Sequence, residues 1–445
     1  MNRFLYTALI RLFSPMLLAW MGLRARRAGG HWEVMSGPRF GYYPEPSPLR
    51  APVWVHAVSL GETRAAEPLV QALLEHGNDV LLTHMTVTGR AEGARVFARA
   101  IAENRLAQQW FPYDFPGPAR RFVNHYRPGV GVLIEREVWP NVIAAARRAR
   151  IPMVLASARF SDHALRQSLR SGRVMREAYE SLQAVYAQAL SDAQRLEQAG
   201  ASAVRVSGNF KFDISLSDPK IARGRAYAAA LARKIVVIAS AREGEDESFV
   251  RALTHQMRRL RSQGYEQAEQ ILFCLVPRHP QRFEAVAAML SAAGITFLRR
   301  SELVRMGELS TSALEASVGA TVLLGDSLGE MPWYYAACKV AIVAGSFGPF
   351  GGQNLIEACA LGAPVIVGPH TRNFEQAVLD AIEEGAAIRA PDPAAALQAA
   401  LQLLDEPQRL SSMEEAGLHW VQRHTGAVAR VLAGIVELER GERAR

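Results

Sequence analysis

The chain has 445 residues, enough for two or three domains, and its composition is that of an ordinary globular protein without repeats. The formal net charge is +8, and arginine supplies most of it, because lysine occurs only at 211, 220, 234 and 339. This charge favours anionic partners, such as phosphorylated substrates, anionic lipid or nucleic acid. Three cysteines in apolar contexts, without CxxC or CxxxH spacing, give no credible zinc ligand set.

Residues 4–23, "FLYTALIRLFSPMLLAWMGL", are apolar apart from Arg11, and Arg24, Arg26 and Arg27 follow directly. A cleaved signal peptide would carry its charge before the apolar core and a small-residue cleavage site after it. We therefore predict an uncleaved membrane anchor or interfacial helix in residues 1–30, with the basic flank on the cytoplasmic side. The alternative is an ordinary amphipathic helix that docks on the rest of the protein.

After a Pro/Gly-rich connector, short apolar runs alternate with segments of helical period, which predicts parallel sheets with helices on both faces. The predicted strands are 53–58, 79–84, 130–135, 152–157 and 184–188, then 235–240, 271–276, 295–298, 321–324, 340–344 and 364–367. The fold class is α/β, with two doubly wound Rossmann-like domains. The predicted boundaries are 31–207 for the first domain, 208–233 for a hinge, 234–408 for the second domain and 409–445 for helices crossing back to the first.

In such sheets, ligands bind beyond the carboxyl ends of the strands, so the residues there are the candidates. The first strand leads into Ser59, Gly61 and Glu62. Glu62 could face an interdomain cleft and take a proton from an attacking hydroxyl, or it could simply complement the dipole of the following helix. Glu135 and Glu137 follow the third predicted strand, where they could orient an acceptor hydroxyl or a sugar, or again serve as helix-start charges.

The second domain presents cations at its strand ends. Ser240 and Arg242 follow its first strand, and Arg278 and His279 follow its second. An arginine beside a loop suits a phosphate, because its planar fork donates two N–H bonds.

A glycine-rich loop, "GSFGPFGGQNLIEA" (345–358), connects a predicted strand to a predicted helix. Gly351 and Gly352, with two earlier glycines, allow the backbone to approach a phosphate closely. Glu357 would lie about one turn into the helix, where it would repel a phosphate but accept hydrogen bonds from a ribose diol. The combination favours a nucleotide as ligand.

Six segments together resemble one family. The segments "HAVSLGE", "IEREVWPN", "SARFSD", "GNFKFD", "VPRHPQRF" and "GGQNLIEACALGAPVIVGPHTRNF" have the order and spacing of the Kdo transferases. Those enzymes move 3-deoxy-D-manno-octulosonic acid (Kdo) from CMP-Kdo to lipid A precursors. The resemblance covers nearly the whole chain and implies a GT-B architecture with two domains facing a cleft, an inverting reaction and no metal or other cofactor.

The resemblance also implies residue roles. Glu62 corresponds to the general base, and Glu135 and Glu137 to the glutamates of the "ETELWPN"-like segment, which with Ser59 and Gly61 would position the acceptor. For CMP-Kdo binding, the resemblance implies Lys211, Arg278, Asn354 and Glu357. The strand-end and loop positions add Ser240, Arg242, Gly351 and Gly352 to the expected donor site. Gln353 stands where the family usually has histidine.

We therefore expect an inverting, metal-independent transferase that moves Kdo to a lipid A precursor, lipid IVA, in lipopolysaccharide biosynthesis. Its expected partners are CMP-Kdo, that acceptor and anionic lipid at the cytoplasmic face of the inner membrane, with no nucleic acid. Because the leaving group and the base would lie on different domains, cleft closure would assemble the site. Two alternatives stay open: another GT-B enzyme, such as a UDP-sugar transferase or epimerase, and a non-catalytic, membrane-tethered nucleotide-binding module.

Overall fold

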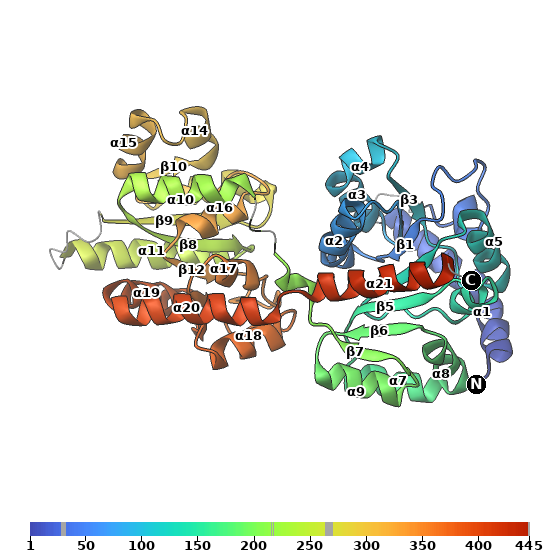
Figure 1. Cartoon of the computed structure of the whole chain (residues 1–445). Helices are drawn as coiled ribbons and strands as arrows, with labels where there is room; N and C mark the ends of the chain where they lie inside the picture. The colour runs from blue at the N-terminus through green and yellow to red at the C-terminus, as the bar shows by residue number, and fades with distance from the viewer. Residues whose placement is uncertain (28–32, 215, 217, 263–269, 444–445) are drawn as a thin grey trace. The chain divides into compact units, whose positions relative to one another are not determined.

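The computed structural model of the chain describes residues 1–27, 33–214, 216, 218–262 and 270–443. Residues 28–30 of the predicted anchor, 215 and 217 of the predicted hinge and 444–445 of the predicted C-terminal helices lie outside the described residues. The chain divides into two units: Met1–Asp213 with His424–Arg445, and Ile214–Arg423 (Figure 1). Each unit is built on one parallel sheet, which in the described residues has seven strands.

The sheet of the first unit has the order β3-β2-β1-β4-β5-β6-β7. Its strands are β1 (Val53–His56), β2 (Val80–His84), β3 (Leu106–Trp110), β4 (Val130–Ile134), β5 (Met153–Ala158), β6 (Ala184–Ala187) and β7 (Val204–Val206). The strand order reverses between β1 and β4, so the connections that leave these two neighbours run in opposite directions. Residues that follow β1 and β4 therefore lie at the point where this class of sheet binds ligands.

Helices cover both faces of this sheet because its central strands are apolar on both faces. Trp54 packs on one face of β1, while Val53 and Val55 pack on the other. The remaining elements are α2 (Leu60–Glu75), α3 (Val87–Val96), α4 (Ala98–Ala102), α5 (Pro116–Tyr126), α6 (Pro140–Arg148), α7 (Asp162–Ser171), α8 (Arg173–Glu180) and α9 (Leu190–Gln198), with the 3-10 turns η1 (Gly37–Phe40) and η2 (Phe210–Phe212).

The last helix, α21 (Ala427–Arg443), belongs to the first unit (Figure 1). It packs on α2, β4, β5 and η2. Asp213, at the end of η2, accepts the backbone N–H groups of Gly426 and Val428 and so caps the first turn of α21. The C-terminal segment thus completes a face of the first sheet.

The sheet of the second unit has the order β10-β11-β9-β8-β12-β13-β14. Its strands are β8 (Lys234–Ala241), β9 (Ile271–Pro277), β10 (Phe297–Arg299), β11 (Val322–Leu324), β12 (Val340–Val343), β13 (Val365–Val367) and β14 (Ala387–Arg389). Its helices are α10 (Pro219–Leu231), α11 (Glu245–Ser262), α13 (Phe283–Ala292), α14 (Arg300–Arg305), α15 (Thr311–Gly319), α16 (Met331–Ala337), α17 (Ile356–Ala360), α18 (Glu375–Glu383), α19 (Pro393–Asp405) and α20 (Pro407–His424), with the 3-10 turn η3 (Pro280–Arg282).

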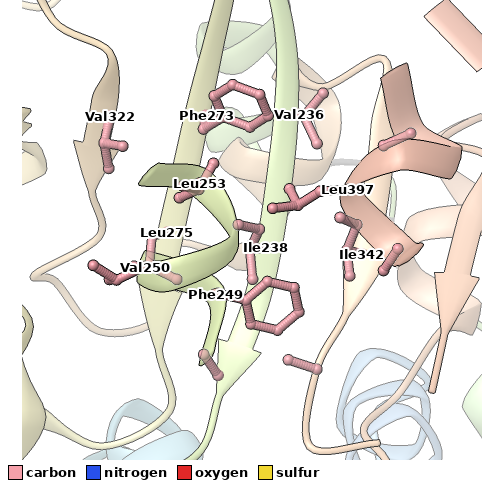
Figure 2. Close-up of a cluster of buried hydrophobic side chains, with 14 of the residues drawn as sticks. Val236, Ile238, Phe249, Val250, Leu253, Phe273, Leu275, Val322, Ile342 and Leu397 are labelled. Atoms are coloured by element: carbon pink, nitrogen blue, oxygen red, sulfur yellow. The ribbon is translucent and has the colours of Figure 1, made fainter. Parts of the chain in front are cut away.

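Figure 2 shows the core on one face of this second sheet, where Val236 and Ile238 of β8 meet Phe249 and Leu253 of α11. Leu397 of α19 closes the same cluster. On the other side, α10 packs against α16, which in turn contacts β8. The helix α10 takes up much of the segment predicted as a hinge.

The N-terminal helix α1 (Arg3–Arg27) packs on α6 and α8 of the first unit. Its stretch Arg3–Leu23 is, in the described part of the chain, the one helix long and apolar enough to cross a membrane, and only 6% of the most apolar window is buried. Length and composition alone are weak evidence for an anchor near the N-terminus.

Candidate active site

Glu62 lies in the first turn of α2, directly beyond β1. Ser59 is the N-cap of this helix, and its hydroxyl accepts the backbone N–H of Glu62 at 3.4 Å. One oxygen of Glu62, Oε2, accepts the backbone N–H of Val58 at 2.6 Å, which fixes the carboxylate against the strand end. Gly61 leaves open space beside it, because a Cβ there would meet only Ser59 Oγ, at 3.9 Å.

The pKa of Glu62 is raised to about 7. Burial is the main cause, and the negative charges of Glu137 and Glu135 act in the same direction, against the hydrogen bond from Val58. A carboxylate with a pKa near neutrality can both accept and release a proton at physiological pH. The helix-dipole interpretation also fits its position, but it does not account for a raised pKa.

Glu135 and Glu137 follow β4, the neighbour of β1. Glu135 has a φ of 59°, a left-handed conformation that costs free energy in a residue with a side chain and occurs often at functional sites. Glu137 Oε2 accepts a hydrogen bond from Trp139 Nε1 at 3.1 Å, and burial raises its pKa. The adjacent strand ends therefore bring Glu62, Glu135 and Glu137 together at one edge of the sheet.

Lys211, expected among the residues for CMP-Kdo, lies in η2 of the first unit. Burial lowers its pKa, while the negative charge of Glu135 opposes that shift. Asn209 caps η2 by accepting the backbone N–H of Lys211 at 3.0 Å. The fold thus places this ammonium with the carboxylates of the first unit.

Three cationic or basic side chains gather at the ends of β8 and β9 in the second unit. The charges of Arg242 and Arg278 both lower the pKa of His279, after the larger effect of burial. Arg242 also stacks on the ring of Phe350, in the glycine-rich loop, at 4.6 Å. Its Nε is buried and has no hydrogen-bond partner within the described residues, so a ligand anion could satisfy it.

Ser240 precedes this cluster and has a φ of 59°. The pairing of β8 with β9 shifts register between Ile238 and Ala241, so Ser240 lies in a bulge. Arg278 then donates its backbone N–H to the oxygen of Ala241 at 2.8 Å, which ties the two strand ends together.

Glu245, at the start of α11, is a residue that the sequence interpretation missed. Its side chain is 4% exposed and accepts four backbone N–H groups. Oε2 binds those of Arg242 and Gly345 at 2.8 and 2.7 Å. Oε1 binds those of Phe347 and Gly348 at 2.8 and 3.0 Å.

The first half of the glycine-rich loop is therefore occupied by a carboxylate of the protein itself. The N–H groups expected to face a phosphate at Gly345 and Gly348 point at Glu245 instead. The sequence has several acidic residues at 243–247 and does not show which of their carboxylates is buried. The one indication of a functional position was that this acidic segment begins a helix directly after a strand. Glu245 joins the loop after β12 to the end of β8.

Gly351 and Gly352 have φ values of 89° and 81°, so the turn requires them. They also allow the loop to approach the segment that follows β13, because a Cβ on Gly352 would lie 3.3 Å from the Cα of Thr371. Gln353 packs on Gly345, where an added Cβ would lie 3.0 Å from its Cγ. Gln353, at the position where the family usually has histidine, therefore packs inside the loop.

Asn354 orients Glu357 at the start of α17. Its Nδ2 donates to Glu357 Oε1 at 2.9 Å, and its Oδ1 accepts the backbone N–H of Ile356 at 3.1 Å. The charges of Glu357 and Arg278 both act on the buried phenol of Tyr335, whose pKa is raised mainly by burial. The predicted ribose-binding carboxylate and the predicted phosphate-binding arginine therefore lie on the same side of the second unit.

No group of three or more His, Cys, Asp or Glu side chains within the described ranges is arranged to hold a metal ion.

Comparisons with known proteins identify relatives of the chain. A family model described as 3-Deoxy-D-manno-octulosonic-acid transferase (kdotransferase) matches residues 36–214, and one described as Glycosyl transferases group 1 matches residues 292–420. The 3-deoxy-D-manno-octulosonic acid transferase of Bordetella pertussis is 53% identical, over 97% of this chain and 98% of its own. The protein of that name from Haemophilus influenzae is 29% identical, over 97% of both chains.

Solved structures show the same fold. UDP-GlcNAc 2-epimerase from Neisseria meningitidis bound to UDP-GlcNAc superposes with a TM-score of 0.54 at 14% identity, over 86% of this chain and 99% of that one. Two parallel Rossmann-like sheets and a neighbour of the same fold give the chain a GT-B-like architecture. The two family models add that it is a glycosyltransferase. The 53% identity to the Bordetella pertussis protein, over almost the full length, identifies the family more specifically than the fold does. The chain belongs to the 3-deoxy-D-manno-octulosonic acid transferase family and is a Kdo transferase by that relationship.

Proposed function

We propose that the protein transfers Kdo from CMP-Kdo to a sugar hydroxyl of a lipid A precursor, lipid IVA, with inversion and without a metal ion. The observation that carries the proposal is Glu62, a carboxylate fixed at the end of β1 with a pKa raised to about 7. In this role, Glu62 takes the proton of the acceptor hydroxyl while its oxygen attacks the anomeric carbon of Kdo. The bond from that carbon to the phosphate oxygen breaks, and CMP leaves with its electron pair.

The first unit has the acceptor role in this proposal. Glu135 and Glu137 position the sugar, and their charges keep Glu62 basic enough to accept a proton. Lys211 lies beside Glu135, so it contributes positive charge near the carboxylate of Kdo rather than near the cytidine.

The second unit has the donor role. The arginines at the ends of β8 and β9 stabilise the negative charge that develops on the phosphate of CMP, as preorganised cations do in transfer reactions. Glu357, held by Asn354 at 2.9 Å, accepts hydrogen bonds from the ribose hydroxyls. The apolar helix α1 keeps the enzyme at the inner membrane, on the cytoplasmic side, where the acceptor lipid is found.

Mass spectrometry of the lipid products tests this proposal. The purified full chain is incubated with CMP-Kdo and lipid IVA in a chelator-containing buffer, and each Kdo unit adds one fixed mass. Glu62→Gln should abolish the product and retain CMP-Kdo binding, while Glu357→Ala should raise the KM for CMP-Kdo. Product formation by Glu62→Gln at the wild-type rate would remove Glu62 from the base role. Binding of UDP in preference to CMP would favour a UDP-sugar enzyme instead.

A further inference from the structure

A pocket of about 590 Å³ lies along α1 in the first unit. Helices α1, α5 and α6 form its walls. Four arginines line it, Arg3, Arg11, Arg120 and Arg148, and no aspartate or glutamate is among its lining residues. So much positive charge around one pocket, with no lining carboxylate, indicates an anionic ligand.

A carboxylate close to this charge, Asp114, already has hydrogen-bond partners. Arg3 acts electrostatically on Asp114, which is 7% exposed. Asp114 accepts hydrogen bonds from the hydroxyl of Tyr6 at 2.8 Å and from the backbone N–H groups of Asn141 and Val142 at 3.2 and 2.8 Å. Its hydrogen bonds therefore hold α1 on the first unit, and Arg3 is the lining arginine with which its charge interacts.

The apolar side of the pocket continues along α1. Phe4 and Ala8 line it, and Leu12, Met16 and Trp20 follow at steps of four residues, which lie next to each other on a helix. Phe4, Leu12, Met16 and Trp20 are 85%, 71%, 68% and 54% exposed. A ligand with an anionic head at the arginines and an acyl chain along this row would use both features.

We propose that this pocket binds the phosphodiester headgroup of an anionic phospholipid of the bilayer, whose acyl chains lie along α1. The inference depends on the membrane association in the proposed function and does not depend on the transfer reaction. Phosphate suits the pocket because arginine forks bind it with two parallel hydrogen bonds. A free phosphate ion would leave the apolar row of α1 unused.

A second pocket on α1 supplies a matched control. Arg147 and Arg173 line it together with Glu177, and Arg173 pairs with Glu177 at 2.5 Å. The double variant Arg147→Gln/Arg173→Gln therefore removes the same charge as Arg120→Gln/Arg148→Gln, also beside α1. Only Arg120→Gln/Arg148→Gln removes arginines from the pocket that has no lining carboxylate; Arg148 lines both pockets, and Arg120 lines the first alone.

The experiment is flotation of the full chain with phosphatidylcholine vesicles, with and without phosphatidylglycerol. Each arginine near an anionic surface contributes about fivefold to partitioning, so Arg120→Gln/Arg148→Gln should lose about 25-fold of the phosphatidylglycerol-dependent binding. The control double variant should lose about fivefold or less, because Glu177 already offsets the charge of Arg173. Arg120→Lys/Arg148→Lys, which keeps the charge and loses the forks, should still bind less tightly than wild type. Thermal unfolding checks that each variant is folded.

Three results would overturn the proposal. Equal losses of vesicle binding in the two glutamine double variants would show that the overall positive charge, and not this pocket, attracts the membrane. Wild-type binding by the lysine variant would show that arginine does not bind the phosphate through paired hydrogen bonds. If Arg120→Gln/Arg148→Gln floats like wild type but has a raised KM for lipid IVA, the pocket binds the acceptor and not a bilayer phospholipid. A wild-type protein that floats as expected and transfers no Kdo would contradict the proposed function alone.

Discussion

The raised pKa of Glu62 predicts how the rate of transfer depends on pH. If Glu62 is the base, the deprotonated form is active, so kcat/KM should rise with pH and level off above the pKa of about 7. Glu137→Gln removes a charge that raises this pKa, so the rising limb should move to lower pH. Initial rates across pH 5 to 9, with Glu247→Gln as a distant control, measure the shift. A limb that stays in place would show that the titrating group is not Glu62.

The same pKa shift predicts that Glu62→Gln stabilises the protein at high pH. The folded-state pKa lies above the ordinary value of 4.5, so ionisation is harder in the folded state, and stability is lost as pH rises from about 4.5 through 7. Glutamine removes that loss. The variant should be more stable than wild type by about 1–3 kcal/mol at pH 8 and nearly equal at pH 4. Urea unfolding of both proteins at pH 4 and pH 8 measures the free energies of unfolding. The same difference between variant and wild type at both pH values would contradict the prediction.

Glu245 is expected to position the donor loop rather than to touch the donor. In Glu245→Gln, the amide NH2 would face two backbone N–H groups in either orientation, because both carboxylate oxygens accept two. We expect a cost of about 2–4 kcal/mol in stability from the unmatched donors. The KM for CMP-Kdo should rise about tenfold or more, with a smaller change in kcat. Glu247→Gln, at an exposed site on the same helix, is the control; a fall in kcat at constant KM would refute the positioning role.

At the scale of elements, the sequence predicted the central strands of both sheets and missed three at the edges. The central strands are continuous apolar runs because helices bury both of their faces. The missed strands β3, β7 and β14 end their sheets and contain half-buried or exposed residues, such as Gln108 and Arg205. These three strands lack a continuous apolar run, so their sequence did not identify them, whereas the fourth edge strand, β10, was predicted from the apolar run at 295–298.

Candidate residues at strand ends are predictable from the sequence wherever the strand itself is, because ligands bind beyond the carboxyl ends of parallel strands. The residues found in this way are Glu62, Glu135, Arg242 and Arg278. Two contributions could not be identified from strand ends. Lys211 follows a short edge strand, and only the fold shows that it faces Glu135. Glu245 is one of several neighbouring acids, and its role depends on a loop 100 residues away.

The N-terminal helix is held to the first unit by a buried polar contact that can be removed singly. Tyr6→Phe removes only the hydrogen bond to Asp114, at 2.8 Å, and should weaken the attachment of α1 by about 1–2 kcal/mol. Trypsin should then cut at Arg11 several times faster, because a helix that loses a packing contact unfolds locally more often and trypsin cuts the unfolded backbone. Tyr42→Phe, at a side chain that is 60% exposed, is the control. Equal cleavage rates in the two variants would show that this contact does not hold the helix.

At the scale of the whole molecule, the two units differ in how the chain builds them. The second unit is one continuous segment, Ile214–Arg423, whereas the first needs both ends of the chain. The helix α21 inserts Ala427, Val431 and Ile435, all fully buried, into the same core as Val53 and Val55. Burying two such branched side chains contributes about 3–6 kcal/mol, a large part of the total stability of an ordinary domain.

This asymmetry predicts opposite behaviour of two fragments. Residues 214–423 should fold alone, with a cooperative thermal transition, because their core is complete within the segment. Residues 1–213 should fail to show such a transition until a peptide of residues 424–445 is added, since Asp213 then caps α21 and the apolar face is covered. Circular dichroism during heating measures both, and a peptide with Val431→Asp is the matched control. A cooperative transition in residues 1–213 without peptide would mean that the first sheet is stable with that face uncovered.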